Sequence, residues 1–66
     1  MQTGIVRSFN DEAGYGFIDT DDGETFFVHH RSIEMEGFRS LAPGEKVFFE
    51  VIHGRRGPEA KNVRRV

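Results

Sequence analysis

The sequence contains no cysteine, so neither a disulfide nor a thiolate-bound metal can hold this chain together. It also contains no tryptophan, and only two of its 66 residues are proline. No apolar run approaches the roughly 20 residues of a membrane span. The segment from Met1 to Gly4 leads straight into an alternating pattern, with no signal peptide. We therefore expect a cytoplasmic protein that does not associate with a membrane.

The chain is short, and its 66 residues predict one domain that spans residues 1–66. A domain of this size buries only about 60% of the surface of its unfolded chain. Its core must therefore be compact, and its stability is expected to be marginal.

The formal net charge is only −2, with 9 basic and 11 acidic residues. This balance argues against a protein that binds duplex DNA mainly through phosphate neutralisation, because such proteins are normally basic. The acidic residues gather in the first 24 positions, as Asp11, Glu12, Asp19, Asp21, Asp22 and Glu24. The basic residues gather in the last 12, as Arg55, Arg56, Lys61, Arg64 and Arg65. One end of the molecule is thus expected to be locally positive.

Five segments alternate in the manner of β-strands, with turn-forming residues between them. They are residues 3–9, 15–20, 25–29, 46–53 and 59–66. Residues 21–23 predict a hairpin turn, residues 32–34 a short helical turn, and Pro43-Gly44 a further turn. No segment keeps a helical apolar period for ten residues. The sequence therefore predicts an all-β fold, a five-stranded antiparallel Greek-key barrel of the OB type.

The most informative stretch is residues 14–30, because it predicts two strands with distinct faces. Residues two apart on a strand share a face. Tyr15 and Phe17 therefore point to one side, and Phe27 and His29 can point the same way on the next strand. An exposed row of rings is costly unless it has a use, and stacking unpaired nucleobases is the use that fits best. The residues expected in the core are Val6, Ile18, Phe26, Val28, Val47, Phe49, Val51 and Val63.

Two segments of the chain resemble the RNA-binding motifs of the bacterial cold shock proteins. Residues 14–18, Gly-Tyr-Gly-Phe-Ile, are similar to the first motif, typically Lys-Gly-Phe-Gly-Phe-Ile. Residues 26–30, Phe-Phe-Val-His-His, are similar to the second, Val-Phe-Val-His-Phe, and residues 37–41 and 57–63 resemble further signatures. The resemblance covers essentially the whole chain. It implies the five-stranded barrel, and binding of single-stranded RNA and DNA with low selectivity and a preference for pyrimidines. It also implies a role as RNA chaperone, antiterminator or regulator of gene expression.

Carried over by position, the resemblance implies a site of rings and basic residues. They are Arg7, Phe9, Tyr15, Phe17, Phe27, His29, His30, Phe38 and Arg56. The chain departs from the family pattern at three positions, where Ser8 replaces a Trp, Ala13 a Lys, and His30 an aromatic ring. Each departure is expected to weaken binding. Stacking is worth about 1–3 kcal/mol per base, so the missing Trp alone could cost about tenfold in affinity.

Several of the aromatic rings allow a second interpretation. Phe9 is as well explained by half-buried support of the core as by stacking. Phe38 could cap the end of the barrel, and Phe48 could be a weak self-association contact or a scattered surface residue. For the rings of residues 15, 17 and 27, the alternative is cross-strand packing, which is compatible with a binding role. We expect a monomer, with a weak dimer as the alternative.

The sequence predicts no enzyme, no cofactor, no small-molecule substrate and no metal site. Adjacent residues on a strand point to opposite faces, so His29 and His30 would chelate a metal poorly unless the strand ends there. The acids lie in turns without catalytic spacing, which argues against a nuclease. The alternative function is a protein-interaction module on the same surface. Because histidine titrates near pH 6.5, His29 and His30 also suggest that binding strengthens in mild acid.

Overall fold

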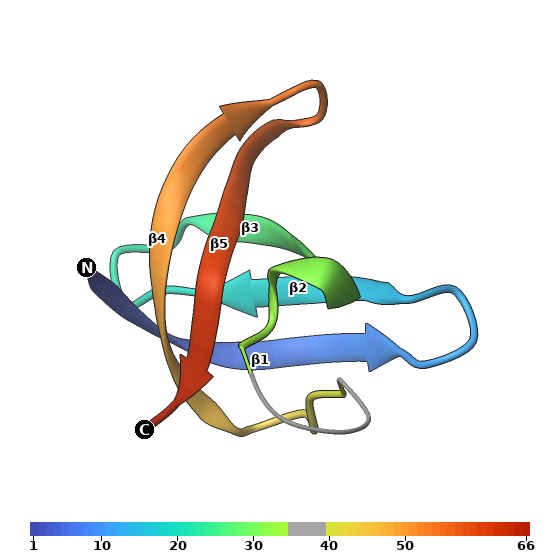
Figure 1. Ribbon diagram of the computed structural model, residues 1–66. Coiled ribbons are helices and arrows are strands. Elements are labelled where there is room, and N and C mark those ends of the chain that lie inside the picture. The colour runs from blue at the N-terminus through green and yellow to red at the C-terminus, as the bar shows by residue number, and fades with distance from the viewer. Residues whose placement is uncertain (35–39) are drawn as a thin grey trace.

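A computed structural model describes residues 1–34 and 40–66, and its five strands form a closed barrel (Figure 1). The strands are β1 (Gln2–Asn10), β2 (Tyr15–Asp19), β3 (Thr25–His29), β4 (Lys46–Gly54) and β5 (Gly57–Arg65). Around the barrel they follow the order β1-β2-β3-β5-β4, and β4 pairs with β1 to close it. This confirms the predicted all-β barrel. The last strand begins at Gly57 rather than at residue 59, because Gly54 and Gly57 already pair across the turn.

One pair of strands departs from the expected antiparallel arrangement. The pairs β1–β2, β1–β4, β2–β3 and β4–β5 are antiparallel, but β3 and β5 run parallel, with Phe27 opposite Glu59 and Val28 opposite Ala60. The reason is geometric. Around a closed ring with an odd number of strands, directions cannot alternate at every pair, so at least one pair must be parallel. Here that pair brings the start of β5 beside the end of β3.

The predicted helical turn exists, but it lies earlier in the chain than expected. A 3₁₀ turn, η1, spans His30–Ser32 instead of residues 32–34. The turn starts here because His29, the residue before it, acts as its N-cap: the backbone N–H of Arg31 donates to Nδ1 of His29 at 3.2 Å. Within residues 1–34 and 40–66, no helix is long and apolar enough to cross a membrane.

The core lies inside the barrel and is built from inward-facing residues of all five strands and of the segments that close its ends. Its members are Val6, Ile18, Phe26, Val28, Ile33, Leu41, Val47, Phe49, Ala60 and Val63. The sequence predicted seven of these residues and did not identify Ile33, Leu41 or Ala60. Val51, also predicted, is only half-buried and packs against the edge of the core. It lies toward the end of the β4–β5 hairpin that extends beyond the other strands (Figure 1).

A β-bulge in β1 decides which of its side chains face the core. The pairing with β2 shifts register between Val6 and Ser8, so Arg7 and Ser8 are both exposed. Beyond the bulge, Phe9 lies opposite the buried Gly16 and is itself half-buried. Phe9 therefore returns to the core side of the sheet.

Candidate nucleic-acid interface

Three aromatic rings form one cluster on the outer surface of β2 and β3, and we call Tyr15, Phe17 and Phe27 the ring face. The ring centroids lie 6.4 Å apart for Tyr15 and Phe17, 5.6 Å for Tyr15 and Phe27, and 6.0 Å for Phe17 and Phe27. Tyr15 is 38% exposed and Phe17 36%, whereas Phe27 is half-buried between its neighbours. The cluster offers flat apolar surface to solvent beside the phenolic hydroxyl of Tyr15.

The ring face is held in place by the pairing of β2 with β3. Phe17 lies directly opposite Phe27, and Tyr15 lies opposite His29. The alternate residues of both strands point inward, and Ile18 and Val28 are completely buried. This confirms the predicted division of the β2–β3 hairpin into a core side and a side that carries rings. Because the strands are fixed by the core beneath them, the rings form a preorganised surface.

Arg56 reaches the ring face from the turn between β4 and β5. Its guanidinium carbon lies 4.9 Å from the centroid of the Phe27 ring. An arginine over an aromatic face is attracted by the quadrupole of the ring. The parallel pairing of β3 with β5 makes this contact possible, because it places the β4–β5 turn beside the end of β3.

The two histidines lie side by side rather than on opposite faces. Strand β3 ends at His29 and η1 begins at His30, so the chain turns between them and their ring centroids are 4.4 Å apart. The ring of His30 packs over Gly14, where an added Cβ would lie 2.6 Å from its Cδ2. In residues 1–34 and 40–66, no group of three or more His, Cys, Asp or Glu side chains could hold a metal ion.

The surroundings of His29 favour its neutral form. Partial burial lowers the pKa of His29 below its ordinary value, and the neighbouring His30, Arg31 and Arg56 lower it further through charge repulsion, against an opposing effect of Glu59. Its Nδ1 also accepts the Arg31 N–H, which requires this nitrogen to be unprotonated. His29 therefore joins the edge of the ring face as a neutral ring.

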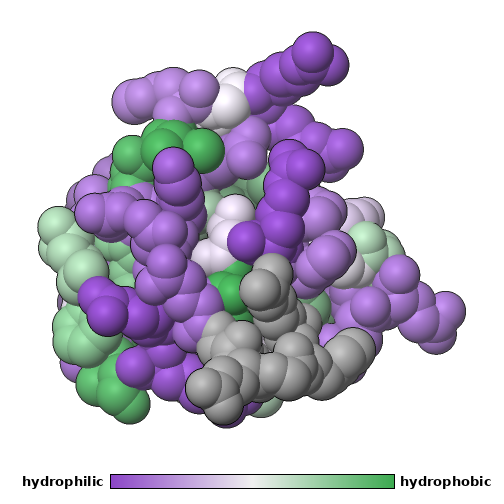
Figure 2. All heavy atoms as spheres, in the orientation of Figure 1, coloured by the Kyte–Doolittle hydropathy of each residue, from purple (hydrophilic) through white to green (hydrophobic). Residues whose placement is uncertain are grey.

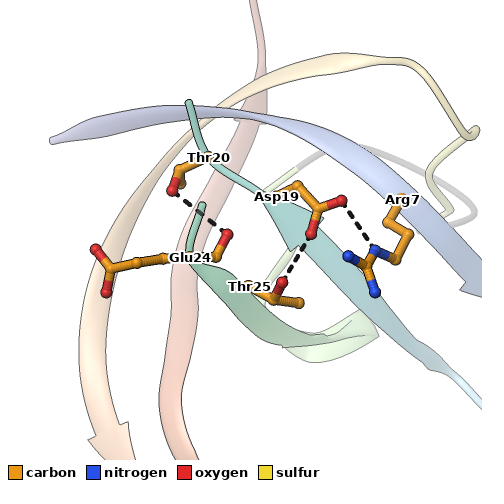
Figure 3. A network of polar contacts seen from close by, with 5 residues as sticks. All are labelled: Arg7, Asp19, Thr20, Glu24 and Thr25. Atoms are coloured by element: carbon orange, nitrogen blue, oxygen red, sulfur yellow. Dashed lines mark hydrogen bonds and ion pairs between the residues drawn. The ribbon is translucent and has the colours of Figure 1, made fainter. Parts of the chain in front are cut away.

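Arg7 lies on the same outer surface but is engaged in an ion pair. Its Nε donates to Oδ2 of Asp19 at 2.9 Å, and Oγ1 of Thr25 donates to Oδ1 of the same carboxylate at 2.8 Å (Figure 3). These two hydrogen bonds, that from Arg7 foremost, hold the pKa of Asp19 below its ordinary value. In the same view, Oγ1 of Thr20 approaches the carbonyl oxygen of Glu24 at 3.4 Å across the hairpin turn. The charge of Arg7 is thus largely neutralised in the free protein.

The remaining predicted positions fall in different places. Phe9 packs against the core from the inner side of β1, apart from the ring face. Ser8 is exposed and lies opposite Phe17, so the position beside that ring carries only a hydroxyl. Ala13 is exposed in the β1–β2 turn. Phe38 lies outside the described residues.

Two basic residues that sequence reasoning did not select lie beside the ring face. Arg31 and Arg55, together with Arg56, line a hollow of about 400 Å³ next to Phe27. The sequence carried a partial signal, because Arg55 adjoins Arg56 in the basic loop and Arg31 follows the two histidines. Only the folded chain shows that these residues share one hollow.

Comparison with known proteins gives a consistent result along the whole chain. Residues 2–66 match the family model described as 'Cold-shock' DNA-binding domain. Cold shock protein CspB of Geobacillus stearothermophilus is 52% identical over 63 residues, and cold shock-like protein CspLB of Listeria monocytogenes is 51% identical over 63 residues. Both alignments cover 96% of this chain and 96% of the relative. Cold shock-like protein CspA of Stigmatella aurantiaca is 52% identical over 67 residues, which cover 100% of this chain and 98% of the relative.

A solved structure, that of drosophila Unr CSD456, has the same fold. It superposes with a TM-score of 0.75 over 98% of this chain at 19% identity. This chain spans only 26% of the length of that structure. At this identity the similarity concerns the fold alone.

Proposed function

The chain belongs to the cold shock domain family, whose members bind nucleic acid, and from this premise we propose that it binds single-stranded RNA and DNA by stacking bases on its ring face. The observation that carries the proposal is the cluster of Tyr15, Phe17 and Phe27 on the outer side of the sheet, in which Tyr15 and Phe17 are exposed beside the half-buried Phe27. Every base has a π-face, so binding by stacking tolerates many sequences, with a modest preference for pyrimidine runs.

The same surface favours unpaired strands over duplexes, because a duplex hides the faces of its bases. A protein that binds only the unpaired state shifts a hairpin toward that state by mass action, without an energy source. This would make the protein a passive RNA chaperone, able to act in antitermination or in the control of translation. We propose that residues 1–66 act as one cold shock domain, as a monomer in the cytoplasm.

The experiment that tests this proposal is a fluorescence-anisotropy titration of labelled oligothymidine of about seven nucleotides, with a hairpin duplex as competitor. We expect saturable binding to the single strand and poor competition by the duplex. Comparison at about 50 and 200 mM salt should give a shallow salt slope, since few phosphates are contacted. Absence of binding at the lower salt concentration would contradict the proposal.

A protein-interaction module on the same surface is the second candidate. Specific observations favour it, because Ser8 leaves the position beside Phe17 without a ring and Arg7 is already paired with Asp19. An acidic net charge also weakens attraction to phosphate. The oligonucleotide titration separates the two candidates, since only the first requires binding to a single strand.

The pKa of His29 predicts how affinity depends on pH. In the free protein this pKa lies below its ordinary value, so His29 is neutral at neutral pH. A phosphate bound beside the imidazole stabilises the protonated form, in which Nδ1 no longer accepts the Arg31 N–H, and so raises the pKa of His29 in the complex. Binding then takes up a proton, and affinity should rise as the pH falls from about 7.5 to below 6.5.

The measurement is the same titration between about pH 5.5 and 8, accompanied by an NMR titration of the histidine ring protons. In the control, His29→Asn keeps a polar side chain at the end of β3 but removes the titratable group, and it should flatten the profile. An affinity that is constant over this range in the unmodified protein would show that no phosphate lies near His29.

A further inference from the structure

The hollow beside Phe27 has a net positive lining. It lies between the end of β3, η1 and the β4–β5 turn, and has a volume of about 400 Å³. Its charged lining consists of three arginines and one acid, Arg31, Arg55, Arg56 and Glu59. Three arginines in one hollow contrast with the net charge of −2 of the whole chain. The concentration of charge points to an anionic ligand.

The arginines of this hollow are available to bind such a ligand. Ion pairs among the described residues involve Arg7, Arg64 and Arg65, and none of them involves Arg31, Arg55 or Arg56. The three arginine side chains are all exposed. The β4–β5 turn that carries two of them stands at the top of Figure 1, and long hydrophilic side chains extend from this region in Figure 2.

The backbone around the hollow fixes where these arginines emerge. The N–H of Arg31 is held by Nδ1 of His29, and Arg55 and Arg56 form the turn closed by the pairing of Gly54 with Gly57. Phe27 belongs both to the ring face and to the lining of the hollow. The two surfaces are therefore continuous.

We propose that the single strand leaves the ring face past Phe27 and that its backbone enters this hollow, where Arg31 and Arg55 bind its phosphates. The inference rests on the proposed function. It adds two phosphate-binding residues, and it says that the bound strand continues from the ring face toward the β4–β5 turn. A base stacked on Phe27 places the adjoining phosphates beside the hollow, and guanidinium groups match phosphate geometry.

The charges of a neighbouring hollow indicate where this path ends. That hollow has a volume of about 440 Å³ and shares Arg31 and Glu59 with the first. Its further charged residues are Glu34 and Lys61, so its acids and bases balance. The cationic surface thus stops at Arg31. The hollow should therefore accommodate only the part of the nucleic-acid backbone that adjoins the ring face.

The proposal predicts that the effect of these arginines depends on oligonucleotide length. An oligothymidine of about four nucleotides occupies only the ring face, whereas one of about eight also reaches the hollow. Arg31→Gln/Arg55→Gln should therefore lower affinity for the longer ligand about fivefold or more, and leave the shorter one nearly unchanged. For this variant and the longer ligand, the slope of log affinity against log salt concentration should become shallower by about 1.4. Two phosphate contacts are lost, and each contributes about 0.7 on a single strand.

The matched control is Arg64→Gln/Arg65→Gln, which removes the same formal charge from residues that pair with Glu34 and Glu45. It should weaken binding of the longer ligand less than the first variant does. Equal losses in both variants, or an equal loss at both lengths, would overturn the inference and leave only general electrostatics. Circular dichroism melts should show that both variants remain folded.

The outcome also separates this inference from the proposed function. If the unmodified protein binds both lengths and Arg31→Gln/Arg55→Gln binds the longer one equally well, the inference fails and the proposed function stands. If the unmodified protein binds neither length at about 50 mM salt, both fail together.

Discussion

The Phe17→Ala/Phe27→Ala variant should lose affinity for single-stranded oligothymidine by about thirtyfold or more. Each ring supports one stacked base, and stacking is worth about 1–3 kcal/mol per base. Two rings therefore contribute at least about 2 kcal/mol, and each 1.4 kcal/mol corresponds to a factor of ten. Because the arginines remain in place, the salt slope should stay close to that of the unmodified protein.

The double substitution should leave the fold intact, which makes the result interpretable. Phe17 and Phe27 face each other across β2 and β3 on the outer side, with ring centroids 6.0 Å apart. A cross-strand pair of this kind stabilises a sheet by about 0.2–1 kcal/mol. The core beneath them is supplied by other residues, such as Ile18 and Phe26.

The matched control is Ile5→Ala/Ile52→Ala, which also truncates two exposed apolar side chains. Ile5 is 41% exposed and Ile52 40%, close to the 36% of Phe17, and neither belongs to the ring face. This control should bind like the unmodified protein in the same anisotropy titration. If the phenylalanine variant binds within about threefold of the unmodified protein, the rings serve cross-strand packing and not stacking.

The ring face could be predicted from the sequence because it depends on local rules. Side chains alternate along a strand, and the turn at residues 21–23 fixes the register of a short hairpin. Tyr15, Phe17 and Phe27 lie on one side for these reasons alone. The barrel was predictable for a similar reason, since five alternating segments without a helical period leave few architectures.

Phe9 shows where this local reasoning stops. The sequence left it open whether Phe9 stacks or supports the core. Val6 and Phe9 are three residues apart, so a regular strand would place them on opposite faces. The bulge at Arg7 and Ser8 shifts the phase, so both residues face the core side. Nothing in the composition of residues 6–9 specifies a bulge.

The cationic hollow could be predicted only in part, for a different reason. Arg31 and Arg55 are distant in the sequence and meet only because β5 pairs parallel with β3. The pairing that closes a barrel is set by the packing of all five strands, and no local pattern encodes it. Arg56 was expected near the site through family resemblance, but its two neighbours in the hollow had no such indication.

Gly16→Ala should destabilise the protein at or above the upper end of the range of about 1–3 kcal/mol that overpacking usually costs. Gly16 faces the core side of β2, directly opposite Phe9 on β1. A Cβ at this position would collide with the carbonyl oxygen of Ser8, and would lie 2.7 Å from Cα and 2.8 Å from Cδ1 of Phe9. Two of these three atoms belong to the backbone, so no change of rotamer relieves the contact.

The measurement is thermal unfolding, in which a loss of about 3 kcal/mol lowers the melting temperature of a domain of this size by more than about 10 °C. Gly44→Ala is the control, because its φ of 88° strains an alanine while nothing lies within 4 Å of the added Cβ. It should cost only about 1–2 kcal/mol. A Gly16→Ala protein that melts no lower than the control would mean that β1 and β2 do not approach closely here.

The same substitution connects the fold to the proposed binding site. Gly16 stands between Tyr15 and Phe17, so the alternation of small and large residues in β2 places the close contact with β1 on one side and two rings on the other. Relief of the collision requires β1 to move away from β2, which displaces Ser8 from its place opposite Phe17. Gly16→Ala should therefore weaken oligonucleotide binding even well below its melting temperature, whereas Gly44→Ala should not. Unchanged affinity in folded Gly16→Ala would show that the ring face does not depend on the β1–β2 pairing.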